Sequence, residues 1–131
     1  MILYLANDLL WATRIKATAE DLGLAARPVR SVEMLEARLK DTEPTGIILD
    51  LESADVAMEI LGRVRGTAAS DRERAIRVVA FAPHVHVEAM EAARVAGADR
   101  VMTRGAFDGG LGRVLQDLSA GQAGSPRDRG A

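Results

Sequence analysis

Short apolar runs alternate along the chain with longer segments in which apolar residues recur every three or four positions. A continuous apolar run is typical of a strand that is buried on both faces, and the longer period is typical of an amphipathic helix. Five segments of each kind alternate, which predicts an α/β domain with a parallel sheet in (βα)5 order. The strands are expected at residues 2–6, 24–30, 46–51, 76–82 and 100–103.

The helical segments carry start and end signals. Ser31 is a candidate N-cap for the second helix and Asp55 for the third, because short polar side chains accept hydrogen bonds from the N–H groups of a first helical turn. Gly23 and Gly97 fit the ends of the first and fourth helices. The apolar positions place the five helices at residues 9–22, 32–39, 56–64, 87–96 and 107–118.

Two segments lack apolar periodicity. Residues 65–75 carry charges of both signs, which favours a solvated connection. From residue 119 the chain is rich in Gly, Ser, Pro and charge, which predicts a domain at residues 1–118 and a flexible C-terminal tail at 119–131. Pro28 lacks a backbone donor, so the second strand is expected at a sheet edge or to end there.

The composition narrows the classes of function. The chain has 131 residues, 48% of them hydrophobic, which fits one compact domain and excludes a multidomain enzyme. With a net charge of −2, the chain lacks the excess of basic residues by which proteins commonly bind nucleic acid or an anionic membrane, so neither is expected as a partner. The absence of cysteine excludes thiolate catalysis and iron–sulfur clusters. The first apolar run ends at Asn7 with no basic segment before it, so we expect no secretory signal and a cytoplasmic location.

The carboxyl ends of parallel strands are where α/β domains gather reactive groups. A carboxylate, Asp50, and a guanidinium, Arg104, are expected there. His84 and His86 follow the fourth strand, but two histidines without an obvious third ligand favour an exposed loop over a zinc site. Trp11 is expected near the same crevice, where burial against the sheet is favoured over a role as partner anchor. No nucleophile elbow or phosphate-binding glycine motif is present, so we expect no enzyme.

Two strings within this order resemble the receiver domains of bacterial two-component signalling. They are IILDL at residues 47–51 and AGADRVMTR at residues 96–104, where that family keeps its phosphoacceptor aspartate and its essential lysine. The resemblance covers residues 2–118. It implies a flavodoxin-like fold, a doubly wound five-stranded parallel sheet between two helical layers.

The resemblance assigns the functional positions of the family to this chain one residue at a time. Asp50 matches the phosphoacceptor, and it alone is retained. The acidic pair that holds magnesium matches Ala6 and Asn7, the hydroxyl residue after the fourth strand matches Ala82, and the lysine matches Arg104. These substitutions indicate an atypical receiver, or pseudo-receiver, in which Asp50 is a vestigial phosphoacceptor.

The other departures affect the metal site and the switch. Magnesium usually needs one or two protein carboxylates. The remaining pocket offers one carboxylate from Asp50, a neutral carbonyl from Asn7 and the backbone of Glu52, so we expect no metal and no cofactor. Three further positions depart from the family. Asp8 lies one position too late to belong to the acidic pair, Gly105 stands where the family has a proline, and Val101 stands where it has the aromatic residue that changes rotamer on activation.

Arg104 suggests what replaces the metal. A guanidinium stays charged and can bind a carboxylate through two parallel hydrogen bonds. Our hypothesis is a permanent pair between Asp50 and Arg104 that lowers the pKa of the aspartate. The alternative is that Asp50 is an inherited acid at a strand end that accepts a nearby backbone N–H.

These inferences favour a signalling module that acts by protein–protein interaction, independently of phosphorylation and magnesium. The partner would be another signalling protein, either a histidine kinase, an output protein or a second copy in a homodimer. The alternatives are a receiver that accepts a phosphoryl group on Asp50 and, with little support from the few aromatics, a module that binds a flavin or corrinoid. In the family, partners commonly bind the face formed by the fourth helix, fifth strand and fifth helix, which would here include Glu91, Arg94, Arg100, Arg113 and Asp117.

Overall fold

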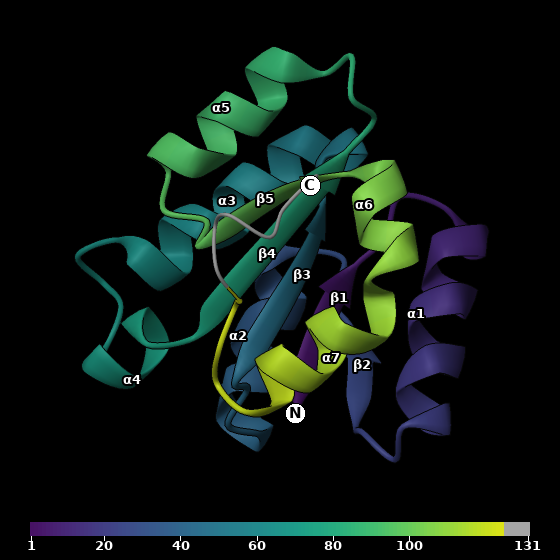
Figure 1. The fold of residues 1–131 in the computed structure, drawn as a ribbon. Coiled ribbons are helices and arrows are strands. Elements are labelled where there is room, and N and C mark those ends of the chain that lie inside the picture. Colours follow the sequence, from purple (N-terminus) through teal and green to yellow (C-terminus); the bar gives the residue numbers. More distant parts are fainter. Residues whose placement is uncertain (125–131) are drawn as a thin grey trace.

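The computed structural model describes residues 1–124, which form one parallel sheet with helices on both faces (Figure 1). The strand order is β2-β1-β3-β4-β5, so the predicted (βα)5 arrangement is confirmed. β2 is an edge strand and ends at Pro28, where the missing N–H costs no ladder hydrogen bond. The strands are β1 (Ile2–Leu5), β2 (Ala26–Pro28), β3 (Gly46–Asp50), β4 (Arg77–Ala82) and β5 (Arg100–Thr103).

The helices lie where the apolar periodicity places them, with three additional short elements. Within residues 1–124, no helix is both long enough and apolar enough to cross a membrane. The helices are α1 (Leu9–Asp21), α2 (Val32–Asp41), the 3₁₀ turn η1 (Leu51–Ser53), α3 (Ala54–Arg65), α4 (Asp71–Arg74), α5 (Val87–Val95), α6 (Arg104–Gly109) and α7 (Leu111–Ser119).

Side-chain caps explain where two of the helices begin. Asp8 accepts a hydrogen bond from the backbone N–H of Trp11 at 2.9 Å and so caps α1. Ser31 accepts from the backbone N–H of Met34 at 3.0 Å, which confirms the predicted cap of α2. The predicted cap at Asp55 is wrong, because α3 begins one residue before it, directly after η1. Asp55 instead lies in the first turn of α3, where its negative charge interacts favourably with the positive end of the helix dipole.

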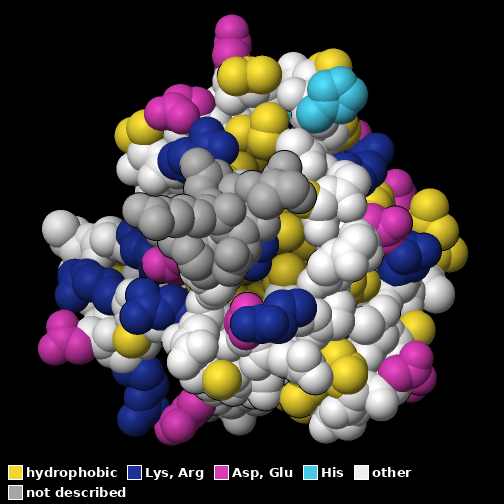
Figure 2. All heavy atoms as spheres, viewed as in Figure 1, with side chains coloured by type: hydrophobic (Ala, Val, Ile, Leu, Met, Phe, Trp, Pro, Cys, Tyr) yellow, Lys and Arg dark blue, Asp and Glu magenta, His cyan; other side chains and the backbone are white. Residues whose placement is uncertain are grey.

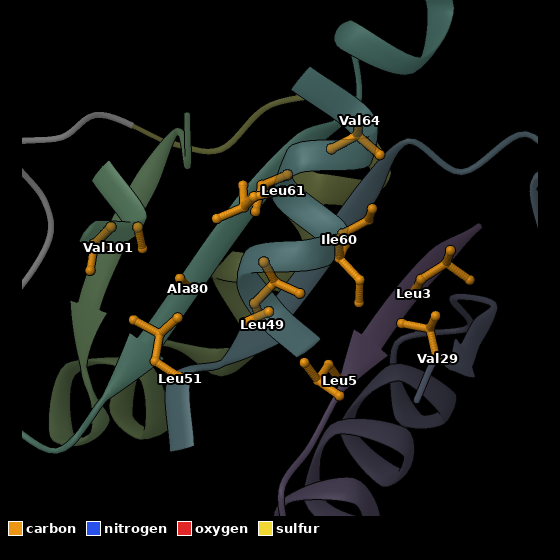
Figure 3. Packing of buried hydrophobic residues seen from close by; sticks show 14 of the residues in the cluster. Leu3, Leu5, Val29, Leu49, Leu51, Ile60, Leu61, Val64, Ala80 and Val101 are labelled. Atoms are coloured by element: carbon orange, nitrogen blue, oxygen red, sulfur yellow. The ribbon is translucent and has the colours of Figure 1, made fainter. Parts of the chain in front are cut away.

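The core consists of two clusters, one on each face of the sheet, and this confirms the three-layer arrangement. Successive strand residues alternate between the clusters. Leu49 packs with Ile60 and Leu61 on the side of α2, α3 and α5, as Figure 3 shows. Ile48 and Phe81 pack on the opposite side, against α1, α6 and α7. The central strands of the sheet are thus shielded from water on both faces.

The last helix differs from the prediction. A single helix at residues 107–118 is replaced by α6 and α7, which meet at Gly110. Two adjacent glycines, Gly109 and Gly110, make continuous helix unfavourable at this point. The hydroxyl of Thr103 caps α6 by accepting the N–H of Ala106 at 3.2 Å. Arg104 is therefore the first residue of a helix rather than part of an extended strand end.

The connection at residues 65–75 is also more ordered than predicted. It contains α4, whose start is fixed by a capping box between Ser70 and Glu73. Glu73 also receives two hydrogen bonds from Arg63 of α3, at 2.8 and 3.2 Å. Residues 71, 72 and 74 are exposed, as a solvated connection predicts, but the short helix α4 was not predicted.

The C-terminal segment is partly described. Ser119 completes α7, and the chain then turns so that Ala123 is only 8% exposed and packs in the cluster beside α7. Residues 119–124 of the predicted tail are therefore within the part of the chain that the structure describes. The rest of the predicted flexible tail, residues 125–131, lies outside the described residues.

Candidate functional site

Asp50 is the last residue of β3 and lies at the carboxyl end of the sheet. Its neighbours in the sheet are β1 on one side and β4 on the other, so the segments after all three strands converge on it. The side chain is fully buried, with 0% of its surface exposed. A buried carboxylate must find hydrogen-bond donors, because it has lost those of water.

The donors of Asp50 come from the backbone. One carboxylate oxygen accepts the N–H of Asn7 at 2.9 Å, and the other accepts the N–H of Glu52 at 3.1 Å. Asp50 thus ties the loop after β1 to the turn after β3. Burial raises the pKa of Asp50, and the two backbone hydrogen bonds oppose that increase because they stabilise the charged form.

Arg104 pairs with Glu52 and not with Asp50. Its Nη2 lies 2.5 Å from a carboxylate oxygen of Glu52, and both side chains are about one third exposed. The predicted pair between Asp50 and Arg104 is therefore wrong, and so is the predicted fall in the pKa of Asp50. The physical reason is local. Arg104 is the first residue of α6, and from this position its guanidinium reaches Glu52 on the solvent side of the turn after β3, whereas Asp50 is buried. The alternative, an acid bound to backbone N–H groups, is confirmed.

Ser53 completes the set of polar contacts, and the sequence interpretation missed it. Its hydroxyl donates to the amide oxygen of Asn7 at 3.0 Å. The atom of Asn7 that was expected to offer a carbonyl ligand is thus already bonded to Ser53. The position of Ser53 in the turn directly after Asp50 was the only available signal in the sequence.

The residues present fit magnesium poorly. Among residues 1–124, Asp50 is the one buried acidic residue, and each of its oxygens accepts a backbone N–H. Glu52 is bound to Arg104, and Asp8 caps α1. Within residues 1–124, no three His, Cys, Asp or Glu side chains are grouped closely enough to hold a metal ion. Asp50 alone is the minimum of the one or two carboxylates that usually hold magnesium.

The other substituted positions lie where the resemblance places them. Ala82 is fully buried at the end of β4 and presents a methyl group beside β5. Val101 in β5 is 2% exposed and belongs to the cluster beneath α3 and α5. Gly105 follows Arg104 in the first turn of α6. Neither Ala82 nor Val101 carries a polar group that could contact a phosphoryl group.

The residues expected on the interaction face separate into two ion pairs and one buried residue. Glu91 and Arg94 pair on α5 at 3.1 Å, and Arg113 pairs with Asp117 on α7 at 3.1 Å. In Figure 2 acidic and basic side chains accordingly lie next to one another over both helices. Arg100 is only 7% exposed, so its assignment to the surface is wrong: the turn at residues 121–124 covers it, and the carbonyl of Ala123 lies 3.5 Å from its Nη1.

The two histidines and the tryptophan singled out in the sequence lie as the simpler interpretation of each predicted. His84 and His86 are exposed in the loop after β4. Trp11 is 6% exposed, and its ring packs 5.1 Å from that of Phe81 and 5.6 Å from that of Phe107, centroid to centroid. Burial of Trp11 against the sheet is therefore confirmed, and its exposed edge belongs to a neighbouring pocket.

Comparison with known proteins gives a clear result for the fold and none for the sequence. No protein-family model matches the chain, and no curated protein matches it. Among solved structures, a response regulator receiver domain from Bermanella marisrubri is 16% identical, with a TM-score of 0.74 over 89% of this chain and 95% of that one. The receiver domain of a histidine kinase from Syntrophus aciditrophicus is 21% identical, with a TM-score of 0.74 over 92% and 89% of the two chains.

A third structure is the receiver domain of the sensor histidine kinase PA1611 from Pseudomonas aeruginosa, which holds a magnesium ion in its active-site cleft. It is 18% identical, with a TM-score of 0.73 over 91% of this chain and 96% of that one. The chain has the fold of the response regulator receiver domains of two-component systems.

Proposed function

We propose that this chain is a receiver-like signalling module that acts by binding another protein, independently of phosphorylation and of magnesium. The observation that supports this most strongly is the set of contacts around Asp50. Both oxygens of its carboxylate accept backbone N–H groups, and the amide oxygen of Asn7 accepts the hydroxyl of Ser53. Each of these oxygens thus already uses one of its acceptor positions for a group of the chain itself, which leaves fewer positions for a metal ion.

The chemistry of phosphoryl transfer supports the same proposal. This reaction depends on positioning and on neutralising the negative charge of the phosphoryl group. Here the nearby cation, Arg104, is bound to Glu52, and Ala82 has no hydroxyl to donate. Loss of one preorganised donor typically costs about 10²–10³ in rate. Loss of the acidic pair and the hydroxyl together makes Asp50 too slow an acceptor to carry a signal.

The partner surface that we propose is the side of the molecule that carries α5. Arg94 and Glu91 are the exposed charges of its central turn, with side chains 40% and 65% exposed. Arg100 is excluded because it is buried, and Asp117 contributes little because its side chain is 15% exposed. The partner in this proposal is another signalling protein, because the fold is one that receiver domains use.

An interaction experiment tests the proposal. The tagged chain is used to capture a signalling protein from extracts of the cells that produce it, and the dissociation constant is then measured with purified partner. We expect the Asp50→Asn variant and the removal of magnesium to leave the dissociation constant within about twofold, and Arg94→Glu to weaken binding by about tenfold or more. Arg72→Glu is the matched control, because Arg72 is 71% exposed on the distant α4.

The alternative function is a receiver that is phosphorylated on Asp50. One observation favours it: Asp50 is retained at the carboxyl end of the central strand β3. Binding of the partner that is lost in Asp50→Asn, or that requires magnesium and a phosphodonor, would favour this alternative and contradict the proposal.

A further inference from the structure

A pocket lies beside the Asp50 site and is not used by the proposed function. Its volume is about 560 Å³, and it opens between the start of α1, the loop after β4 and the start of α6. In Figure 2 charged side chains of both signs and apolar side chains lie next to one another on this side of the molecule, over α1 and α6. The side chains that matter for its chemistry are Leu10, Trp11, Arg14, Pro83, Arg104 and Asp108.

The floor of the pocket is rigid and aromatic. Trp11 is anchored at the start of α1 by the cap at Asp8, and its ring packs against Phe81 and Phe107. Those two rings are stacked on each other with centroids 4.1 Å apart. A floor built from packed aromatic rings changes shape little when a ligand arrives, which lowers the entropic cost of binding.

Two guanidinium groups converge on this floor. The guanidinium carbon of Arg14 lies 5.8 Å from the centre of the Trp11 ring, and that of Arg104 lies 5.9 Å from it. Each cation has a single carboxylate partner among the described residues: Arg14 pairs with Asp108, and Arg104 pairs with Glu52. In addition, the Nε of Arg104 is buried and has no hydrogen-bond partner within residues 1–124. An arginine offers five N–H donors, so both groups retain donors for an acceptor in the pocket.

The rim of the pocket is apolar. Leu10 is 66% exposed although it is a large hydrophobic side chain, and Pro83 faces it from the loop after β4. Exposed apolar groups next to convergent polar ones are typical of small-molecule sites, where the polar groups orient the ligand and the apolar groups hold its body.

From these features we propose that this pocket binds a small carboxylate with a compact apolar body. The carboxylate would lie between Arg14 and Arg104 and accept hydrogen bonds from both, since two planar guanidinium groups suit the two oxygens of a carboxylate. The apolar body would lie against Leu10 and Pro83. This site uses none of the charges on α5, so a failure of benzoate binding would leave the protein-binding proposal unaffected.

Benzoate is a suitable probe, and the chain provides its own reporter. Trp11 is the single tryptophan, so its indole N–H is one resolved signal in a ¹H–¹⁵N correlation spectrum. We expect that signal to shift saturably with benzoate, with a dissociation constant on the order of 1 mM for so small a ligand. Benzamide, which has the same shape without the charge, and inorganic phosphate, which has charge without an apolar body, are each expected to bind at least about tenfold more weakly.

Three variants locate the site. Arg104→Gln and Arg14→Gln are each expected to weaken benzoate binding by about tenfold. Arg113→Gln is expected to have no effect, because Arg113 is exposed on α7, outside the pocket. The remaining signals of each variant's spectrum verify that it is folded. The proposal is overturned if benzoate gives no saturable shift up to about 20 mM, if benzamide or phosphate binds as well as benzoate, or if both pocket variants bind it unchanged.

Discussion

Among residues 1–124, the buried carboxyl group of Asp50 is hydrogen-bonded by two backbone N–H groups and by no side-chain cation. Burial raises the pKa of Asp50 above its usual value of 3.8, so the folded state binds a proton more readily than the unfolded chain does. Ionisation of Asp50 therefore opposes folding. The contribution of Asp50 to the free energy of unfolding falls as the pH rises from 3.8 through the pKa of the folded state. Asp50 costs stability at neutral pH.

Replacement of Asp50 by asparagine should consequently stabilise the protein. We expect Asp50→Asn to raise the free energy of unfolding by about 1 kcal/mol near pH 7, because it removes the buried charge and keeps an oxygen that can accept one backbone N–H. The gain should shrink as the pH falls toward the usual value of 3.8, because a carboxyl group with a raised pKa takes up its proton above that value. Urea unfolding of both proteins at the two pH values measures this difference.

Asp55→Asn is the control for this experiment, since Asp55 is exposed in the first turn of α3. It should gain nothing, and the lost helix-dipole interaction should cost a few tenths of a kcal/mol. A loss of stability in Asp50→Asn near pH 7 would show that the backbone donors outweigh the burial of the charge.

Individual residues were predictable where the interaction is local in the sequence. The cap at Ser31 and the position of Asp50 at the end of its strand follow from patterns that span only a few residues. The partner of Arg104 was not predictable, because it depends on where α6 begins relative to the turn after β3, 52 positions away. From the sequence alone, Asp50 and Glu52 are equally possible partners of Arg104, and only the spatial arrangement distinguishes them.

At the scale of elements, Arg63 joins three helices. From α3 it reaches Glu36 of α2, with Nε at 2.6 Å, and Glu73 of α4, with Nη1 at 2.8 Å. Its side chain is 19% exposed, so these pairs are better shielded from solvent than ordinary surface pairs. The hydrogen bonds from Arg63 lower the pKa of Glu73 to about 2.

Removal of this cation should destabilise the protein in a pH-dependent way. We expect Arg63→Met to lower the free energy of unfolding by about 2 kcal/mol near pH 7. Glu73 has a folded pKa below its usual 4.5, so its contribution is present above 4.5 and is lost as the pH falls through about 2. The difference between wild type and variant, measured by denaturant unfolding, should therefore shrink in acid.

Arg72→Met provides the comparison, because Arg72 and Glu43 form a pair with both side chains more than 70% exposed. We expect it to change stability by less than about 0.5 kcal/mol. Equal losses in Arg63→Met and Arg72→Met would contradict the role assigned to Arg63.

The end of α5 depends on a glycine that the sequence analysis identified correctly. Gly97 has φ of +110°, and a Cβ atom there would lie 2.9 Å from the side chain of Arg65. We expect Gly97→Ala to destabilise the protein by about 1–3 kcal/mol. Gly62→Ala is the matched substitution: Gly62 lies exposed within α3 with open space around it, and alanine there should stabilise the protein by about 0.5–1 kcal/mol. Thermal unfolding distinguishes these opposite signs.

Helix boundaries were predicted less well than helix positions. The periodicity of residues 107–118 is continuous and gives no sign of a break, whereas the backbone turns at Gly110. Periodicity reports which positions face the core, and both α6 and α7 face the same cluster. Only the low helix propensity of the paired glycines indicated the interruption.

At the scale of the whole molecule, the alternation of apolar runs and amphipathic segments was sufficient to predict the class of fold. Continuous apolar strands require cover on both faces, and five helical segments are available to provide it. The strand order β2-β1-β3-β4-β5 could not be read from the pattern itself, because periodicity contains no information on which strands are neighbours. The pocket beneath Leu10 was not predictable, since its walls come from three distant segments.

The central claim is that the chain keeps a receiver fold without the receiver's phosphoryl chemistry. Its direct test is the intact mass of the protein after incubation with a small phosphodonor and magnesium. We expect no gain in wild type, and a gain of about 80 Da, one phosphoryl group, in a variant that restores the family's residues through Ala6→Asp, Asn7→Asp, Ala82→Thr and Arg104→Lys. A gain of about 80 Da in wild type that disappears in Asp50→Asn would contradict the account.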